Sequence, residues 1–208
     1  MIRLYKLLLL VPIIFLGCKA KDTDYQIITQ SIKSMNMNIY TEEGKKSLTI
    51  KSPYSNYDKI NNTFKLNETT INLFKDNELE YIINSDNSEI SNNNQLIELS
   101  GNVFVTSINN KEDKLSANSF SWNTKNSSYI LVGNVYYKNE TITLTSNKAI
   151  LNKDDNIIEF FNPVKYKMND RNNKNKYKIN SNHAYYNIKT KSLIFKSNEE
   201  RVRSKLYF

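Results

Sequence analysis

The sequence predicts an all-β protein in which roughly a dozen or more antiparallel strands form one continuous array. Three observations predict it. A nine-residue phrase recurs four times, a second short phrase follows three of its copies at a constant distance, and the best-ordered segments alternate apolar and polar residues. Such self-similarity is typical of a fold that repeats one supersecondary unit, and the unit predicted here is a pair of strands.

The nine-residue phrase begins with Leu or Ile and is rich in Ser and Asn. Its copies are Ile83–Ser91, Leu115–Asn123, Leu144–Asn152 and Ile179–Asn187. Eighteen residues after the start of the first three copies stand Gly101-Asn-Val103, Gly133-Asn-Val135 and Asn162-Pro-Val164. Copies lie 29 to 35 residues apart. This spacing is too short for two strands and a crossover helix, so antiparallel pairing is favoured.

Alternation identifies individual strands. Thr141–Thr145 and Val164–Met168 alternate apolar and polar residues, as a half-buried strand requires. Within Leu115–Asn123 the apolar parity changes after Ala117, which indicates a bulge or a turn. Earlier strands are expected in a looser copy of the unit, at Leu48–Ser52, Phe64–Leu66, Thr70–Phe74 and Glu80–Ser85. The one helix worth considering is Asp24–Met35, where Tyr25, Ile28, Ile32 and Met35 share a face.

Residues suited to bends stand inside the second phrase. Gly101, Asn102, Gly133 and Asn134 tolerate positive φ, so they suit a kink or a tight turn between strands. Pro163 has no amide hydrogen to give to a ladder, so its position is expected to be a bend or an edge.

The N-terminal sequence resembles a targeting signal. Arg3 and Lys6 precede an apolar run from Leu7 to Leu16, which is too short to span a bilayer comfortably, and Gly17-Cys18 follows. Phe15–Cys18 resembles a lipobox, so residues 1–17 are predicted to be a lipoprotein signal peptide and Cys18, the single cysteine, the lipid anchor. The alternative is an uncleaved signal anchor. We expect residues 18–38 to be a tether and 39–208 the β domain, outside the cytoplasm and membrane-attached.

Charge narrows the class of partner. The net charge is +8, and it is +6 without residues 1–17. This balance suits anionic membrane surfaces or phosphorylated ligands. Nucleic acid is not expected, because the basic residues are dispersed. The densest cluster, Lys165–Lys178, reads more simply as a solvated loop than as a binding site.

The sequence offers little for catalysis. The only histidine, His183, stands in a repeat phrase where another copy has Lys148, so we expect an ordinary strand position. One Cys and one His make no plausible zinc set, and four glycines form no phosphate-binding loop. We therefore expect neither an enzyme nor a cofactor or metal site.

The ordered set of phrases resembles the LptC family of lipopolysaccharide export, over roughly Ile39 to Phe195. The resemblance rests on Ile39–Gly44, Leu99–Val105, Leu131–Val135 and Leu144–Ala149. It implies a twisted, open antiparallel β-jellyroll of the OstA-like kind, whose interior holds acyl chains and whose edge strands join neighbouring proteins. The chain departs from well-known members in having a predicted lipid anchor where they have a transmembrane helix.

Under this resemblance the chain would take lipopolysaccharide from an inner-membrane ABC transporter complex on the periplasmic side and pass it to a periplasmic bridge protein by edge-strand pairing. The expected lipid slot is lined by Val103, Val105, Leu115, Val135, Tyr137, Ile142, Leu144, Val164, Tyr166 and Ile179. The competing hypothesis is a structural or adhesive extracytoplasmic β-lipoprotein, in which the same residues form a dry core.

Overall fold

The structure, a computed structural model, describes residues 29–91, 93–109, 111–126, 128–152, 155–168, 176–197 and 202–207. Every regular element in these ranges is a β-strand. The strands are β1 Thr29–Tyr40, β2 Lys46–Asp58, β3 Thr63–Lys75, β4 Glu78–Ser91, β5 Leu96–Ser107, β6 Lys114–Asn123, β7 Ser128–Lys138, β8 Ile142–Asn152, β9 Ile157–Met168, β10 Lys176–Asn187, β11 Leu193–Lys196 and β12 Arg203–Tyr207.

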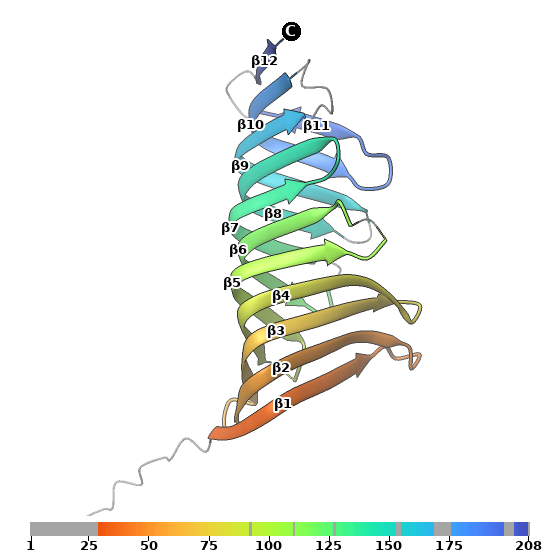
Figure 1. Cartoon of the computed structure of the whole chain (residues 1–208), viewed down its shortest axis with the longest axis vertical. Helices are drawn as coiled ribbons and strands as arrows, with labels where there is room; N and C mark the ends of the chain where they lie inside the picture. The colour runs from red at the N-terminus through yellow and green to blue at the C-terminus, as the bar shows by residue number, and fades with distance from the viewer. Residues whose placement is uncertain are drawn as a thin grey trace, which may run out of the picture.

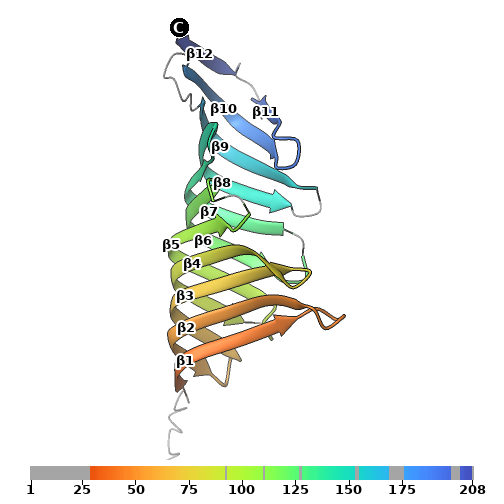
Figure 2. The same ribbon diagram turned by 45° about the vertical axis from the view of Figure 1, so that its right-hand side comes forward.

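All twelve strands belong to one open antiparallel sheet, so the fold predicted from the repeat is confirmed. Each strand pairs with the next in the chain, from β1 to β11, and β12 pairs with β10. Figures 1 and 2 show the strands stacked along the long axis, with β1 at one end and β12 at the other. β11 and β12 both pair with β10, along different halves of it, and together they complete that end.

Each long strand is bent near its middle, so the sheet doubles over into two layers joined along one side (Figure 1). The ladder register shifts at the bend in every pairing from β4–β5 to β9–β10. Leu99 pairs with Phe120 and Val103 pairs with Ala117. Val103 comes four positions after Leu99 on β5, whereas Phe120 comes only three positions after Ala117 on β6. The extra residue makes a β-bulge, which bends the strand that carries it. The parity change in the nine-residue phrase therefore lies opposite a bulge of the neighbouring strand.

Residues with positive φ angles lie at the same bend. Gly101 (φ 72°), Asn102 (45°), Gly133 (78°) and Asn134 (49°) all lie within β5 and β7. The sequence-based expectation of a kink is correct, and that of a turn between strands is wrong. A Cβ on Gly133 would lie 2.8 Å from Asn118 Nδ2, so the facing strand leaves room for hydrogen alone. Pro163 lies at the corresponding bend of β9, as expected.

The polar residues of the repeat phrase hold the bend. The Ser in its third position donates to the backbone carbonyl two residues on, in Ser85 to Asn87 (3.0 Å), Ser146 to Lys148 (2.9 Å) and Ser181 to His183 (3.0 Å). The fourth position faces the Gly-Asn pair, where Asn102 Nδ2 donates to Asp86 Oδ2 at 2.8 Å. Recurrence of Ser and Asn thus reflects hydrogen bonds that a bulged backbone needs.

Three sequence expectations require correction. Residues 29–35 of the considered helix Asp24–Met35 are in β1, so the helix is wrong there; its partner β2 supplies the backbone hydrogen bonds. The sheet begins at Thr29, inside the segment assigned to a tether, and not at residue 39. Phe64–Leu66 and Thr70–Phe74 are two halves of the single strand β3. Cys18 and the signal segment lie outside the described residues.

Candidate functional site

The bend divides the sheet into two arms. The first arm contains the strand halves that carry an inward row of apolar side chains, each directly opposite the next on the neighbouring strand. This first-arm row is Met37, Ile50, Ile71, Ile83, Val105, Leu115, Tyr137, Leu144, Tyr166 and Ile179. It runs unbroken across ten strands, from β1 to β10.

The eighteen-residue offset is explained by this row. The first residue of each phrase lies on an even-numbered strand, as Leu115 does on β6. Four residues after the Gly-Asn pair begins comes the row residue of the next odd strand, as Tyr137 does after Gly133. Leu115 pairs with Tyr137, and Tyr137 pairs with Leu144 of the next copy. A constant offset therefore keeps the row in register from one unit to the next.

All ten residues predicted to line the slot lie on the first arm. Val103, Val135, Tyr137, Leu144 and Val164 are buried, and Val105, Leu115, Ile142, Tyr166 and Ile179 are half-buried. Nine of them belong to or pack on a single apolar cluster; Ile179 is in the first-arm row but not in that cluster. Their convergence on one surface is a finding of the structure, while their contact with lipid remains a prediction.

The sequence reasoning missed the second arm, which supplies the facing wall. One of its inward rows is Leu66, Ser88, Leu99, Phe120, Leu131, Ala149, Phe160, Ala184 and Phe195. A parallel row includes Ile97, Trp122, Tyr129, Leu151, Ile158 and Tyr186. The sequence contains a signal for these rows, because positions six and eight of the repeat phrase are apolar in most copies. From the phrase, the predicted slot used only apolar residues of the first half.

Aromatic rings join the arms in the C-terminal half. The Tyr137 ring lies 5.3 Å from Tyr186 and 6.4 Å from Phe160, both on the second arm. The Tyr166 ring meets Phe195 edge to face at 5.3 Å. Tilted and edge-to-face geometries at these distances are favourable. The arms therefore pack directly on one another between β7 and β11.

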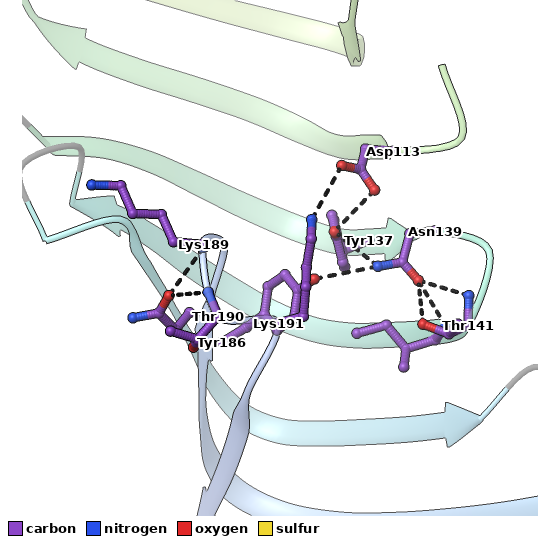
Figure 3. A network of polar contacts seen from close by, with 10 residues as sticks. Asp113, Tyr137, Asn139, Thr141, Tyr186, Lys189, Thr190 and Lys191 are labelled. Carbon is purple, nitrogen blue, oxygen red and sulfur yellow. Dashed lines mark hydrogen bonds and ion pairs between the residues drawn. The ribbon is translucent and has the colours of Figure 1, made fainter. Parts of the chain in front are cut away.

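A network of polar contacts connects the two arms near the Tyr137 and Tyr186 rings (Figure 3). Asn139, in the turn after β7, is buried and donates through Nδ2 to the hydroxyls of Tyr137 (3.2 Å) and Tyr186 (3.3 Å). Tyr137 donates to Asp113 Oδ1 at 3.3 Å, and Lys191 Nζ lies 4.0 Å from Asp113 Oδ2. We call Asp113, Tyr137, Asn139, Tyr186 and Lys191 the clasp, because they connect turns of both arms.

Burial raises the pKa of the Tyr137 hydroxyl far above its ordinary value of 10.0. The folded protein therefore favours the neutral phenol, which donates to Asp113. Stability from this group is fully present below pH 10 and is lost as the pH rises further, because the unfolded chain then ionises first.

The described residues contain no group of three or more His, Cys, Asp or Glu side chains able to hold a metal ion. His183 lies on β10 with its ring 5.3 Å from Phe161 and its Nδ1 3.8 Å from Glu159 Oε1. Across the same ranges, none of the segments forms a helix that could cross a bilayer.

Two models of known protein families match the chain. A family model described as lipopolysaccharide-assembly, LptC-related, matches residues 16–129, more than half of the chain. The chain belongs to this LptC-related family. A second model, described as OstA-like protein, matches residues 108–205. The resemblance to both families seen in the sequence is therefore confirmed.

The two LptC-related and OstA-like matches overlap between residues 108 and 129, where the sheet is continuous. β6 pairs with β7 across this overlap, with the same bulge as in neighbouring pairs. The LptC-related chain is thus one sheet throughout, and the two matches are successive stretches of one array.

Among solved structures the chain is similar to LptH from Pseudomonas aeruginosa, described as the LptA homologous periplasmic component of the lipopolysaccharide transport device. The identity is 13%, the TM-score is 0.47, and the alignment covers 62% of this chain and 94% of that one. No curated protein matches the LptC-related chain.

Proposed function

We propose that this chain is a membrane-anchored periplasmic component of lipopolysaccharide export, which shields acyl chains between its two arms and passes the glycolipid along the sheet. Family membership supports a role in lipopolysaccharide transport. The single observation that carries the shielding step is the unbroken first-arm row, faced by apolar rows of the second arm.

Exposing an acyl chain to water has a large free-energy cost. Each methylene removed from water contributes about 0.8 kcal/mol, so one twelve-carbon chain exposed to water costs about 10 kcal/mol. A continuous apolar row lets an acyl chain move from strand to strand without returning to water. No covalent step is needed, and the energy for directional movement comes from a partner ABC transporter.

Burial indicates how lipid enters. Val135 and Leu144 are fully buried against the opposite arm, so an acyl chain reaches them only if the arms separate. Leu115, Ile142 and Tyr166 are half-buried and are accessible first. The clasp opposes separation between β7 and β10, so we place lipid entry at the half-buried residues and deeper insertion after the clasp opens.

Handover uses the open ends of the sheet. β1 lies at one end, and β10, β11 and β12 lie at the other. An exposed edge can take up a strand of another protein through backbone hydrogen bonds. In this proposal Cys18 is lipidated and holds the chain at the inner membrane, the transporter complex is engaged on that side, and the bridge protein pairs with a free edge.

Photocrosslinking tests the shielding step. Benzoylphenylalanine is placed at Ile142 or Tyr137, which face the interior of the first arm, in membranes that synthesise lipopolysaccharide. We expect both positions to label the glycolipid. Phe161 serves as the matched control, because it is next to the buried Phe160 but faces outward toward His183.

Absence of glycolipid labelling from both interior positions, in variants whose circular dichroism matches the wild type, overturns the proposal. Labelling at Phe161 as strong as at Tyr137 also contradicts it. Either result favours the competing hypothesis of a structural or adhesive β-lipoprotein with a dry core, which the fully buried Val135 and Leu144 also fit.

A further inference from the structure

The excess of basic over acidic residues is concentrated in the last quarter of the sequence. Residues 29–154 carry thirteen Lys against fourteen Asp and Glu, a net charge of −1. Residues 155–208 carry twelve Lys and Arg against five Asp and Glu, a net charge of +7, and residues 1–28 supply the remaining +2 of the total +8. Lipid shielding between the arms does not explain this asymmetry, because the lysines are absent from the inward rows.

Strand pairing lines the lysines up on the outer side of the first arm. Along one outward row, neighbouring strands place opposite one another Lys114, Lys138, Thr143, Lys167 and Lys178. The adjacent outward row is Phe104, Ser116, Tyr136, Thr145 and Lys165. Neither row contains Asp or Glu. Like charges directly opposite each other, such as Lys114 and Lys138, destabilise a sheet, so an external counter-charge would stabilise this arrangement.

We call these two rows the basic face. Its lysines are exposed, and Lys114, Lys138, Lys165 and Lys167 form no ion pair with any residue that the structure describes. Two aromatic side chains in the same rows also face solvent, with Phe104 53% and Tyr136 37% exposed. Lysines beside exposed aromatic rings suit the interface of an anionic bilayer, where cations meet phosphates and rings lie at headgroup level.

The outer side of the second arm differs. Its corresponding row contains Glu89, Glu98 and Glu159. Two of its lysines lie over aromatic rings, Lys148 over Phe161 (5.5 Å) and Lys196 over Tyr185 (4.9 Å). The two rows of the basic face are therefore free of carboxylates and rich in exposed lysines, whereas this row of the second arm is not.

We infer that the basic face docks on the surface of an anionic phospholipid bilayer, with its lysines beside the lipid phosphates and Phe104 and Tyr136 at the interface. Lysines that merely blunt a sheet edge belong on edge strands. Lys114 and Lys138 lie on β6 and β7, in the middle of the sheet, so edge protection does not account for them. The docking does not depend on acyl chains entering between the arms.

The test measures partitioning of the full chain between vesicles of phosphatidylcholine alone and vesicles that also contain phosphatidylglycerol. The variant K114Q/K138Q/K165Q/K167Q removes four charges from the basic face. The control K59Q/K65Q/K125Q/K189Q removes four exposed lysines from the second arm and its turns. The N-terminal segment is common to all three proteins, so its contribution cancels in the comparison.

We expect the first variant to lose at least about tenfold of its preference for anionic vesicles, and the control to lose less than about twofold. Equal losses in both variants would show a dependence on net charge alone and overturn the inference, as would a first variant that behaves like the wild type.

A second measurement locates the contact. Tryptophan at position 136 (Tyr136→Trp) is expected to be quenched by brominated lipids in anionic vesicles. Tryptophan at position 132 (Val132→Trp), on the outer side of the second arm and 46% exposed in the native chain, is expected not to be. The native Trp122 is buried and gives both variants the same background. Equal quenching at the two positions, or none at 136, contradicts docking through this face.

Discussion

At the scale of single residues, the polar and glycine residues of the repeat are those that the backbone conformation at the bend requires. Gly133 has a φ of 78°, and Asn118 occupies the space that a Cβ would need. Ser146 donates its hydroxyl hydrogen to the backbone carbonyl of Lys148, across the bend. These residues recur because every second strand carries a bulge at the same level, whereas the apolar residues beside them vary in size.

Gly133→Ala is expected to destabilise the fold by about 2–3 kcal/mol, since it combines an unfavourable φ with a clash against Asn118. Gly44→Ala is the matched control. Gly44 has the same φ of 78° but nothing within 4 Å of an added Cβ, so about 1–2 kcal/mol is expected. Urea unfolding measures both. Equal losses would mean that Asn118 moves aside and that the close approach contributes nothing.

At the scale of elements, the sequence predicts the strand pairs because the phrase recurs four times and its offset holds in three of the copies. It does not predict where each strand bends relative to its turns. Gly-Asn before an alternating run fits a hairpin as well as a bulge, and the choice depends on the facing Asp86 and Asn118, which are distant in sequence. The second arm was missed for the same reason, since inward parity changes between Ala117 and Phe120, opposite the bulge of β5.

The clasp is the element-level feature that no local pattern indicates, because Asn139 and Tyr186 are 47 residues apart. Asn139→Ala removes hydrogen bonds to two phenols and to the backbone amides of Thr141 and Ile142. A loss of about 2–4 kcal/mol in the free energy of unfolding is expected, since buried partners are left unsatisfied.

Asn187→Ala provides the comparison, because Asn187 makes the same kind of turn, accepting from the amides of Lys189 and Thr190, without contacting a phenol. About 1 kcal/mol is expected there. If chemical denaturation gives the two variants equal losses, the clasp does not join the arms energetically, and its role in opposing their separation is wrong.

At the scale of the whole molecule, the chain is a linear array. Strand pairing in the described residues joins only neighbours in the stack, and side chains such as Tyr137 and Tyr186 add contacts across the two arms. Stability in such an array is approximately the sum of unit and nearest-neighbour contributions, so parts that end at a unit boundary keep their structure. The charge of the array is not uniform, because the near-neutral strands β1–β8 are followed by strongly basic ones. One sheet thus combines a continuous apolar interior with two ends that differ in net charge.

Truncation after Asn152 is therefore expected to leave β1–β8 folded. The shortened chain should unfold cooperatively, with a lower midpoint and a urea dependence of about two-thirds of the full-length value, in proportion to the surface buried. Truncation after Asn147, halfway along β8, keeps almost as many residues but removes the partner of Tyr129 and Leu131 on the second arm. It should be much less stable than its length implies, because an apolar half-strand is then uncovered. If both fragments unfold together at low urea, stability depends on the entire stack, and the additive description fails.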